Sequence, residues 1–160
     1  MNADNLKYLL SDIEMNDQIL GKEKKYFNSA VLLPLIKLKG ETHLLFQQRA
    51  QGIKQENEIC FPGGKYDLDL DQNYQQTAVR ETIEELGVKK EEINILAKLG
   101  TIVAPMGATM DAYVGELKIS DLNDLQINYE EVAEVFDIHL SYFKDYTTQQ
   151  YKERDEIHTH

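Results

Sequence analysis

The stretch "YQQTAVRETIEELG" (residues 74–87) decides the fold, because it predicts a helix in the middle of the chain. We expect this helix to cover residues 74–86. Asp71 or Asn73 can cap its N-terminus, and Gly87 can end it in the left-handed conformation. The element is therefore bounded by a polar start signal and a glycine stop signal.

Apolar and acidic residues recur along this helix with helical spacing. Val79, Ile83 and Leu86 fall at i, i+4 and i+7, which predicts a stripe buried against the rest of the protein. Glu81 and Glu85 are also four residues apart. We expect them on roughly the opposite face of the helix.

The acidic residues stand at the unfavourable end of the helix. Glu84 and Glu85 occupy the last turn, where the negative end of the macrodipole costs about 0.3–1 kcal/mol for each exposed acid. Glu81 and Glu85 also repel each other by about 0.2–0.5 kcal/mol. Two interpretations remain open: a solvated acidic face with an Arg80–Glu84 ion pair, or a divalent-cation site, since hard cations bind converging carboxylates.

Strand patterns flank the helix on both sides. A hairpin with a turn at Gly40–Glu41, a short central strand and two later strands are predicted, over residues 29–40, 42–50, 59–61, 94–104 and 108–119. Residues 4–20 carry helical spacing, and residues 129–146 fit either a helix or a strand. This alternation predicts a mixed α/β or α+β fold in one domain.

Composition excludes several function classes. The 160 residues carry a net charge of −11 and a pI near 4.8, which disfavours binding to a nucleic acid polymer. An apolar run of about 18 residues, which a membrane span needs, is absent from the sequence. The single cysteine and the polar, acidic N-terminus favour a cytoplasmic protein.

A calcium-loop interpretation of "DLDLD" (residues 67–71) fails. Its acids occupy loop positions 1, 3 and 5. Gln72 then stands where the loop needs glycine, and Ala78 stands where it needs a bidentate acid. These aspartates are expected to solvate the loop and to favour the helix N-terminus.

Residues 63–88, "GGKYDLDLDQNYQQTAVRETIEELGV", resemble the signature of the Nudix hydrolases. The second half matches completely, at Arg80, Glu81, Ile83, Glu84, Glu85, Gly87 and Val88. The first half departs from the pattern, because the Gly64-to-Arg80 interval is two residues longer and Gln72 replaces a glutamate. The resemblance implies one Nudix domain over residues 1–160, a Nudix-type α/β/α sandwich with a mixed β-sheet.

The same resemblance implies hydrolysis of a nucleoside diphosphate derivative with Mg²⁺ or Mn²⁺. Glu81 and Glu85 would be metal ligands, and Glu84 would be a further ligand or would help to deprotonate water. Arg80 would complete the catalytic group by fixing the loop or by orienting a carboxylate with its forked donors. The backbone of Gly63 and Gly64 would approach the substrate, and a carbonyl near Gly64 would add a metal ligand.

The preceding segment, "LFQQRAQGIKQENEICFPGGK" (residues 45–65), resembles the coenzyme A diphosphatase branch of the family. The matching positions are Leu45, Arg49, Ile59, Phe61, Pro62, Gly63 and Gly64, whereas Ala50 and Asn57 depart. This branch implies cleavage of coenzyme A to 3′,5′-ADP and 4′-phosphopantetheine. Arg49 would then meet the 3′-phosphate, or it is a surface arginine at the end of a hairpin.

Several alternatives stay open at this point. The substrate could be ADP-ribose, a dinucleotide or a nucleoside triphosphate, and a catalytically inactive Nudix fold could serve as a ligand-binding module. The general base could be Glu116, Glu130 or Glu131. The branch usually continues to a last packed helix, whereas residues 147–160 are polar here. A homodimer is a further possibility.

Overall fold

The computed structural model describes residue 22 and residues 26–105 and 107–144. In chain order its elements are β1 (Phe27–Leu38), β2 (Glu41–Arg49), β3 (Ile59–Cys60), β4 (Gly63–Lys65), α3 (Tyr74–Leu86), η1 (Lys90–Glu92), β5 (Ile93–Ala104), β6 (Ala108–Leu117), η2 (Leu122–Asp124), β7 (Val132–His139) and η3 (Leu140–Lys144). The helix predicted over residues 4–20 and the polar tail over 147–160 lie outside the described residues.

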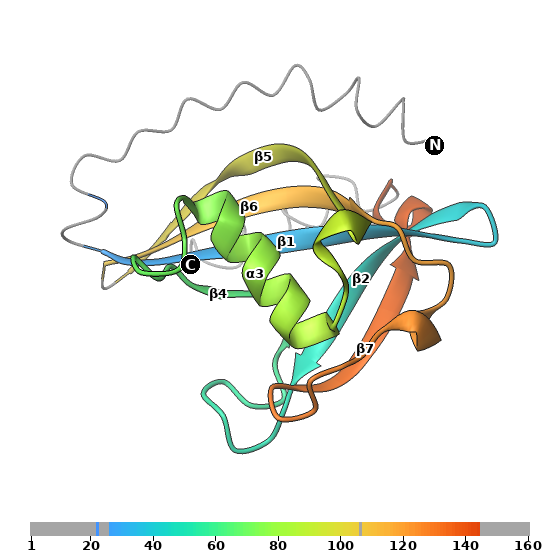
Figure 1. The fold of residues 1–160 in the computed structure, drawn as a ribbon, viewed down its shortest axis with the longest axis horizontal. Helices are drawn as coiled ribbons and strands as arrows, with labels where there is room; N and C mark the ends of the chain where they lie inside the picture. Colours follow the sequence, from blue (N-terminus) through green and yellow to red (C-terminus); the bar gives the residue numbers. More distant parts are fainter. Residues whose placement is uncertain (1–21, 23–25, 106, 145–160) are drawn as a thin grey trace, which may run out of the picture.

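The seven strands of the described residues form one mixed sheet. Its order is β3-β2-β1-β6-β5, with β4 beside β1 and β7 beside β2. Strands β1 and β6 run parallel and the other pairs run antiparallel. Helix α3 packs across one face of the sheet, over β1 and β4 (Figure 1). The predicted mixed sheet with a packed helix is confirmed.

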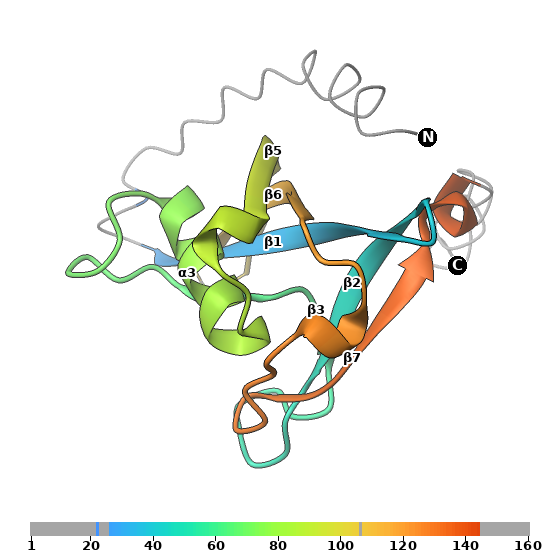
Figure 2. The same ribbon diagram turned by 45° about the vertical axis from the view of Figure 1, so that its right-hand side comes forward.

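Strands β1 and β2 diverge soon after their hairpin. They pair only from Leu35↔Leu44 to Leu38↔Glu41. Beyond that point β3 pairs with β2 and β4 pairs with β1, whereas β7 pairs with β2 from His43 to Arg49. Strands β2 and β7 thereby turn away from β1 and β6 (Figure 2). The segment 59–65 bridges the two diverging strands, and the Leu32 N–H donates to the Pro62 carbonyl at 2.9 Å. We call this segment, residues 59–65, the wedge. It places Gly63 and Gly64 under α3.

The main core lies between α3 and the sheet and includes Ala30, Leu32, Ile36, Leu45, Ala78, Leu86, Tyr113 and Leu117. The helix face that enters it differs from the predicted stripe. Thr77, Ala78, Thr82, Glu85 and Leu86 are buried, whereas Val79 and Ile83 are only half-buried. The prediction that Glu85 points away from the core is therefore wrong. Donors from the wedge and from β2 bind Glu85, so its burial becomes tolerable.

Two further differences concern strands. Residues 132–139 form β7, which resolves the ambiguity over 129–146, because pairing with β2 overrides the helical spacing. Strand β4 was not predicted, since Gly-Gly-Lys has little intrinsic strand preference and is held by its pairing with β1. The hairpin turn falls on Lys39 and Gly40, one residue earlier than predicted.

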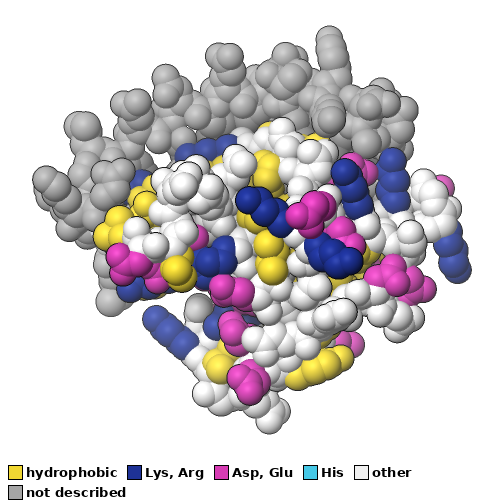
Figure 3. Space-filling model, in the orientation of Figure 1, with side chains coloured by type: hydrophobic (Ala, Val, Ile, Leu, Met, Phe, Trp, Pro, Cys, Tyr) yellow, Lys and Arg dark blue, Asp and Glu magenta, His cyan; other side chains and the backbone are white. Residues whose placement is uncertain are grey.

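The surface over α3 carries mixed charges. Acidic and basic side chains lie beside one another on this face, with hydrophobic side chains between them (Figure 3). Within the described part of the chain, no helix is both long enough and apolar enough to cross a bilayer.

Candidate active site

The N-terminus of α3 is fixed by Asn73, one of the two predicted caps. Its Oδ1 accepts a hydrogen bond from the Gln76 N–H at 2.9 Å. Asp71, the other candidate, is not the cap. Its side chain is buried and accepts a hydrogen bond from Arg80, which lies further along the helix. Capping satisfies one of the free N–H groups of the first turn.

A later loop, including Gln126 and Asn128, donates hydrogen bonds to the C-terminus of α3. These bonds explain why acidic residues are tolerated at this end of the helix. Gly87 adopts the left-handed conformation with φ 66°, and a Cβ there would lie 2.2 Å from the Gln126 carbonyl oxygen. The Gln126 N–H donates to the Leu86 carbonyl and the Asn128 N–H donates to the Glu85 carbonyl, both at 3.0 Å. These donors reduce the negative charge that the helix end presents to its own glutamates.

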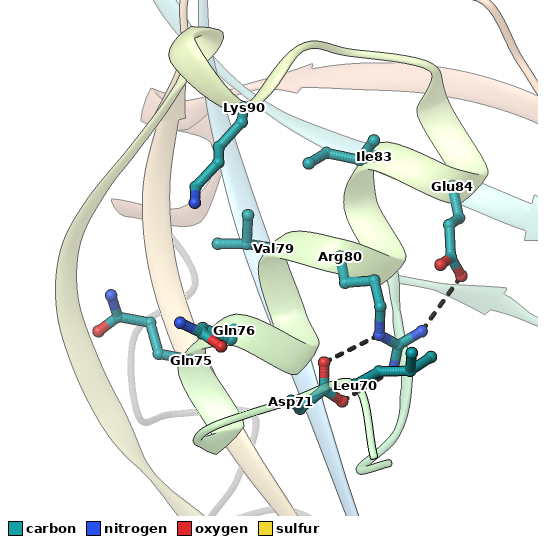
Figure 4. Close-up of a pocket in the computed structure, with 9 residues that line it drawn as sticks. All are labelled: Leu70, Asp71, Gln75, Gln76, Val79, Arg80, Ile83, Glu84 and Lys90. Carbon is teal, nitrogen blue, oxygen red and sulfur yellow. Dashed lines mark hydrogen bonds and ion pairs between the residues drawn. The ribbon is translucent and has the colours of Figure 1, made fainter. Parts of the chain in front are cut away.

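Arg80 is the centre of a charge network (Figure 4). Its Nε and Nη2 donate to the two oxygens of Asp71 at 2.9 Å each. Its Nη1 donates to Glu81 at 2.9 Å and to Glu84 at 3.2 Å, and Nη2 also reaches the Lys65 carbonyl at 3.1 Å. The hydrogen bond to Arg80 lowers the pKa of Asp71, and it raises the pKa of Arg80. The predicted Arg80–Glu84 pair is confirmed as one arm of this network.

Glu81 lies directly over the wedge. A Cβ added to Gly64 would be 2.5 Å from the Glu81 carboxyl carbon, so only glycine allows this close approach. Burial raises the pKa of Glu81, the neighbouring Arg80 opposes this shift, and the negative charges of Glu84 and Glu131 add to it. Glu81 is therefore a partly desolvated acid held by one side of Arg80.

Glu85 lies deeper, with 3% of its surface exposed. Its Oε2 accepts two hydrogen bonds of 3.0 Å, one from the Gly63 N–H and one from Gln47 Nε2. Burial raises the pKa of Glu85 to about 7 despite these donors, and the negative charges of Glu81 and Glu131 add to the shift. Such a perturbed acid beside a second acid is typical of a functional site.

The donor chemistry of this pair suits a hard divalent cation. Each acid has one oxygen held by a protein donor, and no donor among the described residues reaches the other oxygen. Carboxylate oxygens are the ligands that Mg²⁺ and Mn²⁺ prefer, and a cation would relieve the repulsion. Glu84 is directed to Arg80 instead, and the described residues contain no preassembled group of three His, Cys, Asp or Glu side chains.

The other predicted substrate residues lie at the two ends of the wedge, Gly63 and Gly64 under the acids and Arg49 beside Glu58. Gly63 and Gly64 lie beneath Glu85 and Glu81 respectively. Arg49, at the end of β2, donates to the Lys54 carbonyl at 2.9 Å and is half-buried. Its charge acts on the Cys60 thiol, whose pKa is raised mainly by burial. No contact between Arg49 and the acids themselves is present among the described residues.

Of the three candidates for the general base, one faces the acids. Glu131 influences the pKa of both Glu81 and Glu85. It lies in the loop that closes on α3, where its carboxylate accepts a hydrogen bond from Asn128 Nδ2 at 3.0 Å. Glu116 forms a 3.9 Å ion pair with Lys37 near the far end of β1. Glu130 is exposed at the surface of the same loop. The negative charge of Glu131 acts on both Glu81 and Glu85, so Glu131 is the best placed of the three.

Two residues of the site were missed from the sequence. Asp71 was treated as a cap, and Gln47 was not considered. A signal for Gln47 exists, because Leu45 and Gln47 share one face of β2 and Leu45 points into the core. An amide at an inward position of a strand indicates a specific polar partner.

A groove of about 410 Å³ runs along the outer side of α3 (Figure 4). Its lining is Leu70, Asp71, Gln75, Gln76, Val79, Arg80, Ile83, Glu84 and Lys90. The lining includes Glu84 and Arg80 but neither Glu81 nor Glu85, so this groove lies beside the acid pair rather than over it.

Comparison with known proteins places the chain in a family. A family model described as NUDIX domain matches residues 26–154. Mitochondrial coenzyme A diphosphatase NUDT8 of Mus musculus is 35% identical over 125 residues, which cover 77% of this chain and 59% of the relative. Peroxisomal coenzyme A diphosphatase NUDT7 of Mus musculus is 38% identical over 116 residues, covering 71% and 48%. The chain thus spans roughly half the length of these relatives.

A solved structure agrees on the fold. A C. elegans Ap4A hydrolase in a binary complex has a TM-score of 0.58 and 22% identity, covering 74% of this chain and 84% of that chain. With a family model over most of the chain, relatives above one-third identity and a shared fold, the chain belongs to the Nudix family.

Proposed function

We propose that this chain is a divalent-cation-dependent hydrolase that cleaves the diphosphate linkage of a nucleoside diphosphate derivative, with coenzyme A as its substrate. The products would be 3′,5′-ADP and 4′-phosphopantetheine. The observation that carries the proposal is the acid pair Glu81 and Glu85, held over the glycine wedge by Arg80, Gly63 and Gln47. The names of the two mouse relatives support the choice of coenzyme A.

Nudix hydrolases generally use divalent metal ions. In this chain Glu81 and Glu85 would hold Mg²⁺ or Mn²⁺, with Glu84 joining once it leaves Arg80 and a carbonyl near Gly64 adding a ligand. The bound ion would supply positive charge against the diphosphate oxygens and a lowered pKa for water. It would also let a protein with net charge −11 bind an anionic substrate.

The protein's own groups have separate tasks in this proposal. Water adds to a phosphorus atom of the diphosphate, the bridging P–O bond breaks, and the proton of the water passes to a base. Glu131 would accept that proton, a role supported by the effect of its charge on both acids from a different loop. Arg80 orients Glu81, and Arg49 would receive the 3′-phosphate of coenzyme A.

We further propose a cytoplasmic location, a single domain over residues 1–160 and a homodimer. The two mouse relatives are named for mitochondria and peroxisomes.

A substrate panel tests the proposal. Coenzyme A, ADP-ribose, a dinucleoside polyphosphate and a nucleoside triphosphate are incubated with the protein and Mg²⁺ or Mn²⁺, and the products are separated by chromatography. We expect coenzyme A to have the highest kcat/KM and to yield the two products named above. Faster turnover of ADP-ribose would show that coenzyme A is not the preferred substrate. The proposed reaction class, diphosphate hydrolysis, would stand. No turnover of any of them would favour a ligand-binding module.

The role of Glu131 has its own test. Glu131→Gln should lower kcat by about 100-fold or more, which is the usual contribution of a general base. The variant should also lose the acidic limb of the pH–rate profile, while Mn²⁺ affinity changes little. Glu130→Gln, at the adjacent exposed position, serves as the matched control and should keep wild-type rates. Full activity in Glu131→Gln would exclude Glu131 as the base.

A further inference from the structure

Gln47 is an unusual residue for the middle of a buried strand. It is 1% exposed. On the two strands that flank β2, it pairs with Cys60 of β3 and Val135 of β7. Strands on both sides fix its backbone. Leu45, on the same face, is also 1% exposed and belongs to the core beneath α3. An apolar side chain of similar size would fit this position without the cost of burying an amide.

Of the two polar atoms of the Gln47 amide, only Nε2 forms a hydrogen bond within the part of the chain that the structure describes. Its Nε2 donates to Glu85 Oε2 at 3.0 Å and lies 3.8 Å from the Cys60 sulfur. Its Oε1 is buried, and no hydrogen-bond donor for it is present among the described residues. A buried carbonyl oxygen without a donor is unfavourable for stability. A stable core alone therefore gives no reason for glutamine at this position.

The useful consequence lies at Glu85. Gly63 N–H and Gln47 Nε2 approach the same carboxylate oxygen, Oε2, from the wedge and from β2. Two donors on one oxygen restrict the rotation of the carboxylate and leave Oε1 as the oxygen that can turn to a ligand. Arg80 does the same for Glu81, since its Nη1 binds Oε1 and leaves Oε2. Each acid therefore has one oxygen left for a ligand, Oε1 of Glu85 and Oε2 of Glu81.

We infer that Gln47 is a positioning residue of the cation site: it holds Glu85 in the orientation that binds the divalent ion, as Arg80 holds Glu81. Partners that orient metal ligands generally contribute 10–100-fold to metal affinity. This inference deepens the proposed function and rests on it. Gln47 lies on β2, outside the Nudix signature of residues 63–88. The inference is that this residue controls the affinity of the site for the divalent ion.

The test is a Mn²⁺ titration, followed by the electron paramagnetic resonance signal of the free ion. We expect Gln47→Leu to bind Mn²⁺ about 10–100-fold more weakly than the wild type. Its melting temperature in EDTA should change little, because the loss of the bond to Glu85 is offset by removal of the buried carbonyl that has no donor. At saturating Mn²⁺ the KM for the nucleotide substrate should be unchanged, whereas a merely structural defect would alter stability and KM together.

Two further variants complete the design. Gln47→Asn keeps a buried amide but is one methylene shorter, so it should lose the bond to Glu85 and bind Mn²⁺ as weakly as Gln47→Leu. Gln48→Leu is the matched control, because Gln48 points to the opposite face of β2 and donates to the Asn57 carbonyl at 3.2 Å. It should bind Mn²⁺ like the wild type.

The outcomes separate this inference from the proposed function. Wild-type affinity in both Gln47 variants, with Mn²⁺ binding intact in the wild type, overturns the role of Gln47 and leaves the proposed function standing. A wild type that binds no Mn²⁺ overturns both. Equal weakening in Gln48→Leu also overturns the inference, because the effect would then not depend on the bond to Glu85.

Discussion

Glu85→Gln is expected to abolish almost all activity while leaving a folded and, without metal, more stable protein. The substitution removes a charged ligand from the site and should lower kcat/KM by at least about 100-fold, as the loss of a central electrostatic group does in other enzymes. The shape is preserved, since the glutamine oxygen can still accept from the Gly63 N–H and Gln47 Nε2. Chromatographic assay of coenzyme A hydrolysis measures the loss.

The stability gain of this variant depends on pH in a defined direction. Burial raises the pKa of Glu85 from 4.5 to about 7, so the folded state binds a proton that the unfolded state releases between these values. Wild-type stability should therefore fall as the pH rises from about 4.5 through 7, by up to about 3 kcal/mol at 1.36 kcal/mol per unit. Above pH 7 in EDTA, Glu85→Gln should exceed the wild type by this amount, and below pH 4.5 the two should agree.

Urea unfolding at several pH values, with EDTA present, measures this difference. Glu84→Gln is a suitable control, because it makes the same chemical change in the same helical turn at a side chain that is 48% exposed. A Glu85→Gln variant that keeps full activity would show that Glu85 is not a ligand. A variant less stable than the wild type at pH 8 would contradict its buried, proton-binding role.

Arg80→Met should be the most destabilising substitution at the site. The Asp71 side chain is 1% exposed and depends on the forked bond from Arg80, so removing Arg80 leaves a buried anion without its cation. Breaking a buried pair in this way costs about 3–5 kcal/mol. For a chain of this size the melting temperature should fall by about 10 °C. Activity should also fall, because Glu81 loses its donor.

A double-mutant cycle checks the cause. Arg80→Met with Asp71→Asn should be more stable than Arg80→Met alone, because the buried charge is removed. The pKa of Asp71 is lowered in the fold, so the contribution of the pair is present above about pH 4 and is lost as the pH falls below the ordinary pKa of 3.8. Surface substitutions usually change stability by no more than about 0.5 kcal/mol. An Arg80→Met variant that loses only this much at pH 7 would refute the buried pair.

The sequence predicted the helix 74–86 with its bounds, because its start and stop signals are local: Asn73 caps it and Gly87 ends it. The hairpin and the two later strands were also predictable from their apolar patterns. Strand β4 was not, since three residues with weak strand preference are held as a strand by their pairing with β1, which is distant in the sequence. Local signals fail where tertiary pairing decides the structure.

The burial of Glu85 illustrates a second limit. Periodicity assigned the inner face to Val79, Ile83 and Leu86, because it assumes that apolar residues face the core. Gly63 in the wedge and Gln47 on β2 donate to this buried carboxylate, and such long-range partners are invisible in the helix sequence. The three signature glutamates were found, but their separate environments were not.

The most direct measurement is a Mn²⁺ titration of the wild type and of the double variant Glu81→Gln/Glu85→Gln, followed by the resonance signal of free Mn²⁺. The account predicts that the wild type binds Mn²⁺ and that the double variant, still folded by circular dichroism, binds it at least about 100-fold more weakly because two charged ligands are lost. Equal binding by the two proteins would contradict the claim that this pair of glutamates holds the cation.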